Sequence, residues 1–382
     1  MLGAVQHFFL GDRPVFDRKL ILAVLALLII SIVLISSASV MEAFTRYGDS
    51  THYLKRQLVY TVAGLAVFIF TAAIPVRVLQ RISTYFLFFS LFLLVVVLFV
   101  GREINEAKRW IEFGFFNVQP AELLKLSWVL YLSSYAQRRI AEIRTQRKGF
   151  YKPLAFICVI AVMLLLQPDF GSFVVVTAIT FGILFVAGAG LLKYILTGFV
   201  VSVIGGLLIW QQPYRMERVM SFRNPWLDEF GSGYQLTQSL MAFGRGGMTG
   251  QGLGNSIQKL GYLPEAHTDF VTAILGEEFG FAGMMVVLCL EFFIVLKAVL
   301  LGMAILRRGP DFKGFAAFGI GLWFCLQTVI NIGAASGALP TKGLTLPLIS
   351  YGGSSLMLSM AAVAIVLRID FEWRSSNNAG AP

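Results

Sequence analysis

The stretch "LPEAHTDFV", residues Leu263–Val271, places two carboxylates and a histidine directly before a long apolar run. A carboxylate at the rim of a membrane span is partly desolvated, and this raises its pKa towards the range of a general base. Asp269, the acid nearest the apolar run, is therefore the candidate base. Glu265 and Thr268 are candidate supporting groups. His267 is a candidate substrate-binding group or second proton acceptor, although we favour a hydrogen-bonding support.

A purely structural role for the same aspartate stays open. Pro264 disfavours a helical conformation at the residue before it, so a helix is expected to begin later. Thr268 could cap that helix, and the negative charge of Asp269 would then interact favourably with the helix dipole.

A second charged group lies inside an expected span, Ala121–Tyr135. Glu122 and Lys125 are three residues apart, so they share one face of a helix and can form an ion pair. Charged residues inside spans are rare and indicate function. The pair either neutralises itself in the bundle or faces a polar groove near Arg109, where cations could stabilise a pyrophosphate leaving group.

Three further acids follow breaks in the apolar pattern. Glu277 and Glu278 lie two turns or more after Asp269, so one of them is expected to face the same groove. Asp169, in "QPDFGS", is expected to form a turn.

Six of the eleven residues from Gly244 to Gly254 are glycine. A glycine-rich loop can hold phosphate with backbone N–H groups, or it can supply turns with positive φ or a mobile segment. We favour turns or mobility. A P-loop is excluded, because the chain contains no Gly-Lys pair.

The sequence contains no metal-ligand spacing and only three histidines. A divalent cation, Mg²⁺ or Mn²⁺, would need carboxylates and a substrate phosphate. The three cysteines are far apart in apolar stretches and suggest neither disulfides nor a zinc site.

The composition indicates what must position these groups. Only 14% of the 382 residues are charged and the mean hydropathy is +0.76, which is typical of a membrane protein. The net charge of +10 lies mostly in short breaks between apolar runs, so we attribute it to membrane orientation and expect no nucleic-acid partner.

The apolar runs predict an all-α polytopic membrane protein, because they lack the alternation of barrel strands. The first run is too long for a signal peptide, so we expect it to be an uncleaved span. About ten spans are expected: Leu20–Val40, Leu58–Ile74, Ser83–Val100, Ala121–Tyr135, Pro153–Gln167, Ser172–Gly188, Leu191–Trp210, Phe270–Leu296, Phe315–Gly337 and Gly352–Leu367.

The short basic segment "QRRIAEIRTQRK" predicts that both termini are cytoplasmic. The expected organisation is a cytoplasmic segment (1–19), a ten-helix domain (20–369) and a cytoplasmic tail (370–382). A large extracytoplasmic loop (211–270) lies between helices 7 and 8. The final "SSNNAGAP" is expected to be disordered.

These segments together carry a resemblance. "NIGAASGALPTKGLTLPLISYGGSS" (Asn331–Ser355) resembles the signature of the SEDS family (shape, elongation, division and sporulation). "RWIEFG" and "QPAELLKL" resemble the family's segment before and within the fourth span, and "LPEAHTDF" resembles its large loop. The loop is more similar to that of the cell-division members than to that of the elongation members.

The resemblance implies a peptidoglycan glycosyltransferase of the bacterial inner membrane, acting at the division septum. Such enzymes polymerise lipid II into β-1,4 glycan strands and release undecaprenyl pyrophosphate. The implied partners are a class B penicillin-binding protein and other divisome membrane proteins. The family's essential loop aspartate falls on Asp269, and its other charged positions fall on Arg109, Glu122 and Lys125.

The α-linked donor and β-linked product imply inversion by a single displacement, with Asp269 as base and Arg109, Lys125 or an ion at the leaving group. The motif containing Lys342 and Ser350 could contact substrate, but we favour a cavity-shaping role. The alternatives are a lipid II flippase, a non-catalytic divisome scaffold and, less favoured, an ion-coupled transporter.

Overall fold

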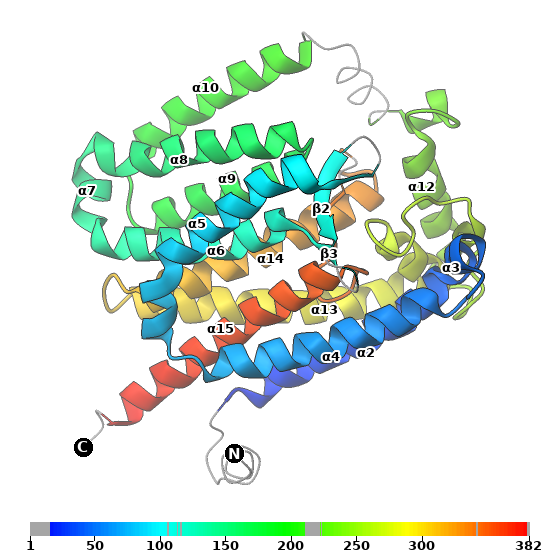
Figure 1. Cartoon of the computed structure of the whole chain (residues 1–382), viewed down its shortest axis with the longest axis horizontal. Helices are drawn as coiled ribbons and strands as arrows, with labels where there is room; N and C mark the ends of the chain where they lie inside the picture. Colours follow the sequence, from blue (N-terminus) through cyan, green and yellow to red (C-terminus); the bar gives the residue numbers. More distant parts are fainter. Residues whose placement is uncertain are drawn as a thin grey trace.

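The computed structural model describes residues 16–104, 107–112, 114, 117–210, 222, 224–340 and 343–379. Its long helices run side by side between two ends of the molecule (Figure 1). Ten of them match the ten expected spans: α2 (Arg18–Ala38), α4 (His52–Ala73), α5 (Val76–Val100), α6 (Pro120–Arg138), α8 (Arg147–Leu166), α9 (Phe170–Val186), α10 (Leu191–Trp210), α13 (Val271–Leu306), α14 (Phe312–Ala335) and α15 (Gly353–Ala379).

Within the described residues, seven helices are long and apolar enough to cross a membrane, and α9 and part of α10 are shorter apolar helices. The remaining one, α6, is less apolar and almost entirely buried in the bundle. Large apolar side chains such as Phe88, Phe92 and Phe99 are exposed on the outside of α5. This is a multi-pass helical protein whose apolar exterior suits lipid.

The helix boundaries follow local capping. The Asp17 carboxylate accepts hydrogen bonds from the N–H groups of Lys19 and Leu20, at 2.9 and 3.3 Å, and starts α2. Asp311 caps α14 in the same way through Lys313. Several helices extend a turn or more beyond the apolar run that predicted them, since polar turns at a membrane surface can remain helical.

The expectation of an all-α fold omits a small antiparallel sheet at the ends of α5 and α6. Its strands are β1 (Arg102–Ile104), β2 (Ala107–Glu112) and β3 (Asn117–Val118), in the order β1-β2-β3. Strand β2 pairs with β3 through Ile111 and Val118, and it carries Arg109. The strands were not expected because they are too short for a clear alternating pattern.

Short helices occupy the connections. Helix α3 (Val40–Tyr47) follows α2, and α7 (Ile140–Thr145) lies in the basic connection. The large loop contains the 3-10 helices η1 (Pro225–Asp228) and η2 (Gln258–Leu260) and the α-helix α12 (Tyr234–Gly246), which packs against α13.

The expected disordered tail is wrong over most of its length. Helix α15 continues to Ala379, so residue 369 is no structural boundary. The Glu372 carboxylate accepts a hydrogen bond from the Val76 N–H at 2.9 Å and pairs with Lys313 at 2.9 Å. These contacts tie the end of α15 to the start of α5 and α14.

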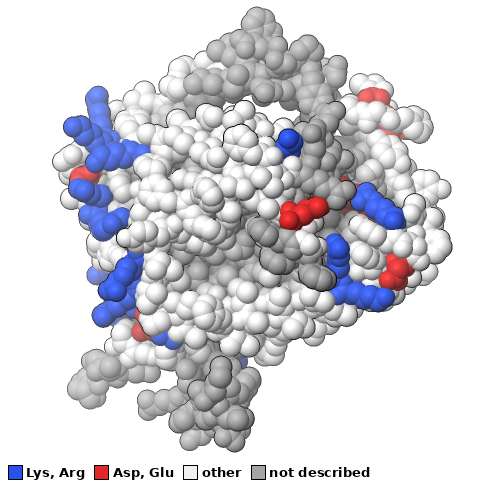
Figure 2. Space-filling model, in the orientation of Figure 1, with Lys and Arg blue, Asp and Glu red and all other residues white. Residues whose placement is uncertain are grey.

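Charged side chains gather at the two ends of the molecule, and the visible middle is almost free of them (Figure 2). The end that contains α7 is predominantly basic, as the positive-inside rule requires of a cytoplasmic face. We call the opposite end, which shows both signs of charge, the outer end.

Candidate active site

A cavity of about 950 Å³ lies at the outer end. Its wall is built by the end of α2 with α3, by the small sheet, by the first turns of α6 and α9, and by two loops. The loops are 259–270 and 343–351. The cavity is lined by the charged side chains of Glu42, Arg46, Arg109, Glu122, Asp169, Lys259, Glu265 and Asp269.

Asp269 lies in this wall, immediately before α13, with its side chain partly exposed. The Asn331 amide on α14 donates hydrogen bonds to the backbone oxygens of Asp269, at 2.9 Å, and Leu344, at 2.6 Å. The Asp269 carboxylate lies against Gly343, where a Cβ would be only 2.5 Å from Oδ2. One buried side chain therefore fixes both the aspartate and the glycine that makes room for it.

The surroundings of Asp269 hold its pKa far above the usual value. Burial makes the largest contribution and the negative charge of Glu265 adds to it, whereas Arg109 opposes the rise. Together they raise the pKa of Asp269 to about 7. A carboxylate with this pKa can accept a proton in the neutral range.

Arg109 reaches the cavity from β2. Its guanidinium donates to the backbone oxygens of Gln167, at 3.0 Å, and Pro168, at 2.7 Å. These contacts hold it beside Asp169, which caps α9 by accepting a hydrogen bond from Ser172 N at 3.0 Å. The expected turn role of Asp169 is confirmed, and its side chain also lines the cavity.

Glu122 and Lys125 form the expected ion pair, with Nζ 2.7 Å from Oε1 and both side chains buried. Glu122 lines the cavity and Lys125 lies beneath it, donating also to Gln327 Oε1 at 3.1 Å. Gln327 in turn donates to the Thr345 backbone oxygen at 2.7 Å. The pair is both a neutralised structural pair and part of a polar cavity, which joins the two interpretations left open by the sequence.

His267 does not line the cavity. Its Nδ1 lies 3.0 Å from Glu42 Oε2, and its ring packs against Tyr53 and Tyr351. Its backbone oxygen accepts a hydrogen bond from Tyr351 N at 3.0 Å. His267 is buried and outside the cavity lining, so the prediction that it binds substrate is not supported by its position, and its contacts are those of a hydrogen-bonded side chain within the wall.

Thr268 does not cap α13, because the N-cap residue is Phe270. Its hydroxyl instead donates to Glu265 Oε2 at 2.6 Å, and both residues line the cavity. The expected cap is wrong because a turn between Glu265 and Phe270 delays the start of the helix.

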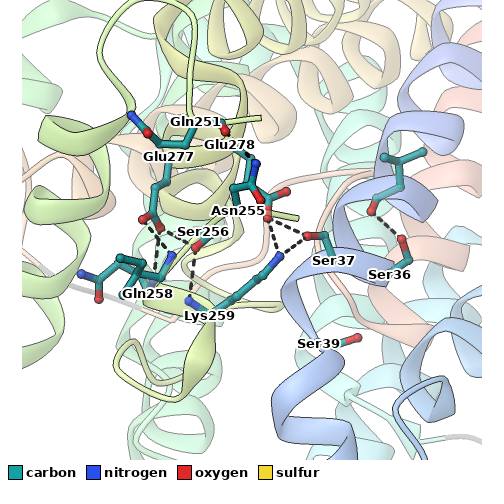
Figure 3. Close-up of polar contacts among 12 residues, drawn as sticks. Ser36, Ser37, Ser39, Gln251, Asn255, Ser256, Gln258, Lys259, Glu277 and Glu278 are labelled. Atoms are coloured by element: carbon teal, nitrogen blue, oxygen red, sulfur yellow. Dashed lines mark hydrogen bonds and ion pairs between the residues drawn. The ribbon is translucent and has the colours of Figure 1, made fainter. Parts of the chain in front are cut away.

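Neither Glu277 nor Glu278 lines the cavity, so that expectation is wrong. Both turn towards the loop that precedes the site (Figure 3). Glu277 accepts hydrogen bonds from Arg245 at 2.6 Å and from Ile257 N at 3.0 Å, and another from the Ser256 hydroxyl. It therefore supports the site indirectly by anchoring the loop that leads to Asp269.

Glu278 makes a separate junction between the loop and α2. Its Oε1 accepts hydrogen bonds from Ser37, at 2.6 Å, and from Lys259, at 2.8 Å (Figure 3). Lys259 also donates to the Ser37 hydroxyl at 2.7 Å. Three elements that are distant in sequence meet here and form one side of the cavity.

The glycine-rich segment docks on a break in α13. Gly280 has φ 66° and ψ −165°, which interrupts the helix. Gln251 N and Gly252 N donate to the freed oxygens of Glu277 and Glu278, each at 2.9 Å. Gly250, Gly252 and several neighbouring glycines have positive φ, which confirms the expectation of turns.

Ser350 is buried, and its hydroxyl accepts a hydrogen bond from Leu346 N at 2.8 Å. It shapes the cavity-forming loop, as expected for its motif. Lys342 lies outside the described residues.

Among the residues described, no group of three or more His, Cys, Asp or Glu side chains is arranged to hold a metal ion. The acidic lining offers single carboxylates, so a divalent cation would take most of its ligands from substrate phosphate and water.

The sequence interpretation missed several residues, namely Glu42, Arg46, Lys259, Gln327 and Asn331. A signal existed for two of them. Trp323, Gln327 and Asn331 are spaced by four residues, which places polar groups on one face of an apolar helix. Nothing local in the sequence indicated that Glu42 would lie beside His267.

Residues 18–375 match the FtsW/RodA/SpoVE family model, described as cell cycle protein. The chain is 52% identical to the probable peptidoglycan glycosyltransferase FtsW of Tolumonas auensis, over 98% of this chain and 97% of that one. It is 48% identical to the protein of the same name from Escherichia coli, over 97% and 91%.

Solved structures agree with these sequence matches. One comes from a study titled "Structural coordination of polymerization and crosslinking by a peptidoglycan synthase complex". It has a TM-score of 0.78 and 29% identity, covering 94% of this chain and 98% of that one. The rod shape determining protein RodA of Thermus thermophilus gives a TM-score of 0.67 at 27% identity, covering 94% and 97%.

Proposed function

The chain belongs to the FtsW/RodA/SpoVE family of cell cycle proteins, and from this and the geometry we propose that it is an inverting peptidoglycan glycosyltransferase. Its substrate is lipid II, and its products are β-1,4 glycan strands and undecaprenyl pyrophosphate. The observation that carries the proposal is Asp269, a carboxylate of raised pKa in an outer-end cavity that also contains Arg109.

The reaction requires one base and one site for negative charge. The acceptor sugar hydroxyl attacks the anomeric carbon of the donor, a C–O bond forms, and the bond from that carbon to the pyrophosphate breaks. Asp269 receives the hydroxyl proton, and the released pyrophosphate carries away the bonding electron pair. Attack from the face opposite the leaving group inverts the α-linkage to β.

Among the described residues, Arg109 is the cation best placed to stabilise the leaving pyrophosphate. A guanidinium has five N–H donors, so its two backbone contacts leave donors available for phosphate oxygens. Lys125 lies below the cavity surface, so we assign it to neutralising Glu122 rather than to direct contact.

A divalent cation, Mg²⁺ or Mn²⁺, would be held by substrate phosphates together with Glu265 or Asp169 of the lining. It would supply additional neutralisation of the pyrophosphate when bound.

The charged lining residues all come from the outer end of the bundle, which supports chemistry on one face of the membrane. A lipid II flippase would be expected to carry polar groups through to the other face. A non-catalytic scaffold would have no need of a carboxylate kept unpaired beside a cation.

The relatives' names and the synthase-complex structure support a place for the protein in peptidoglycan synthesis. We propose that this synthesis takes place at the division septum, in the inner membrane. We infer a transpeptidase of the class B penicillin-binding protein type as its partner, within a larger set of divisome membrane proteins.

The test uses the purified chain with its cognate transpeptidase and lipid II in detergent, comparing wild type with Asp269→Asn at equal amounts of folded protein. Glycan strands from wild type alone support the proposal. Equal amounts of polymer from both proteins would remove Asp269 as the base. Lipid II translocation in vesicles without polymer from either protein would favour the flippase.

A further inference from the structure

The cations that line the cavity divide into two groups. Arg109 lies next to Gln167 and Pro168, at the first turn of α9, and acts directly on the charge of Asp269. Arg46, on α3, lies on another part of the wall, with its Nη2 3.0 Å from Glu42 Oε1.

Glu265 is close enough to influence groups on both sides of the cavity. Its charge acts on Asp269 and also on Arg46. Arg109 is one of the main influences on the pKa of Asp269, and Arg46 is not among those main influences. Arg109 is therefore held on the side of the cavity formed by β2 and the residues before α9, and Arg46 on the side formed by α3, where Glu42 contacts His267 of the loop that carries Asp269.

The separation of Arg109 and Arg46 on two sides of the cavity matches the chemistry of the two substrates. In a polymerase of this type, both donor and acceptor are linked to a polyprenyl pyrophosphate. The donor's pyrophosphate is bonded to the reacting carbon, so it must lie beside the base. The acceptor's reacting hydroxyl is separated from its own pyrophosphate by a disaccharide, so that pyrophosphate must lie farther from the base.

We propose that Arg46 forms a second pyrophosphate-binding subsite, which holds the lipid-linked acceptor while Arg109 holds the lipid-linked donor. The inference rests on the proposed polymerase function and adds the assignment of the two substrates. Glu42 holds Arg46 in place and is itself held by His267. The side chain of Arg46 is 61% exposed, so it remains accessible to a ligand.

Lys259 supports the same subsite. It lines the cavity, and two of its three N–H donors are taken by Ser37 and Glu278. Its side chain is only 8% exposed, so Lys259 contributes positive charge beside the subsite rather than a direct contact. Because Lys259 also joins the loop to α2, Arg46 is the better residue to substitute.

The two subsites predict different kinetic defects. The bond to the acceptor's pyrophosphate does not break, so its contact contributes equally to the ground state and the transition state. Loss of such a contact raises KM and leaves kcat nearly unchanged. The donor's pyrophosphate gains charge as it leaves, so loss of Arg109 lowers kcat.

The experiment measures elongation of preformed lipid-linked strands by the purified complex while lipid II is varied. Arg46→Gln is expected to raise the KM for lipid II about tenfold, the loss of one charge-assisted hydrogen bond, with kcat within about twofold of wild type. Arg46→Lys should recover part of the affinity. Arg109→Gln should lower kcat at saturating lipid II.

Lys55→Gln is the matched control, since Lys55 is another exposed cation near the outer end, paired with Asp49 and outside the cavity lining. The subsite assignment is overturned if Arg46→Gln and Lys55→Gln share the wild-type KM, or if Arg46→Gln lowers kcat alone. Failure of the proposed function would look different: wild type would make no polymer, or Asp269→Asn would match it.

Discussion

Two carboxylates at the cavity surface differ because their surroundings differ. Glu122 is paired with the buried Lys125, with Oε1 2.7 Å from Nζ. Asp269 receives no hydrogen bond to its carboxylate from the described residues, and burial together with Glu265 raises its pKa to about 7. The arrangement around Asp269 provides a proton acceptor that works near neutral pH.

Polymerisation by the wild type should therefore depend on pH through Asp269. The charged form is the active base, so kcat/KM is expected to fall about tenfold for each pH unit below about 7. Rates measured across the neutral range check this. A flat profile with chemistry rate-limiting would contradict the assignment.

The same carboxylate should make Asp269→Asn more heat-stable than wild type at mildly alkaline pH. The pKa is 3.8 in the unfolded chain and about 7 in the folded one, so the folded state binds the proton more tightly. The contribution of Asp269 to stability is then greatest below pH 3.8 and is lost as the pH rises through about 7. The uncharged amide avoids this loss. A lower Tm for the variant, measured by thermal unfolding in detergent, would show that the carboxylate stabilises the fold.

At the scale of elements, the interruption of α13 explains how the glycine-rich loop is held in place by backbone hydrogen bonds. Gly280 breaks the helix, and the segment around Gly250 supplies replacement partners for the freed backbone groups. Glu277 then anchors the continuation of the loop up to the turn that carries Asp269. The position of the base thus depends on backbone contacts several turns away.

Gly280→Ala should destabilise this junction. The left-handed conformation costs a non-glycine residue about 1–3 kcal/mol, and the added Cβ would clash with the backbone of Met248 and Gly250. Both Tm and polymerisation rate are expected to fall. Gly198→Ala in α10 is the matched control, because its Cβ would meet no neighbouring atom within 4 Å. Equal behaviour of the two variants would argue against the docking role.

At the scale of the whole molecule, charged side chains lie at the two ends, and the distribution of Lys and Arg between these ends predicts which end faces outwards. The basic residues around α7 mark the cytoplasmic end by the positive-inside rule. The cavity then opens on the opposite face, where a lipid-linked substrate and an extracytoplasmic transpeptidase would meet it.

Single cysteines can test this orientation in a chain whose native Cys158, Cys289 and Cys325 are replaced by alanine. Glu229→Cys lies at the outer end and Ser376→Cys on the last helix, both at exposed positions. A membrane-impermeant maleimide applied to intact cells with a permeable outer membrane should label the first. The second should react only after the inner membrane is opened. The reverse pattern would invert the orientation.

The sequence by itself predicted the ten long helices, and it placed Asp269 at the start of α13 and Glu122 inside α6. The orientation and the catalytic role of Asp269 stay predictions. The length of the apolar runs, the charges at the span ends and the residues of "LPEAHTDF" are local properties of the sequence. They can be interpreted without knowing which distant elements pack together. The same reasoning gave the Glu122–Lys125 pair, because three residues along a helix fix which side chains can meet.

Only the tertiary structure decided which distant groups surround Asp269. Asn331, Gly343 and Arg109 approach it from separate elements, and Glu42 reaches His267 from the end of the first span. One of Glu277 and Glu278 was expected to face the cavity, but both face the loop, because the direction of a side chain around a helix is set by the packing of neighbouring elements. The sequence supplies the reactive group, and packing between elements far apart in the chain supplies the environment that sets its pKa.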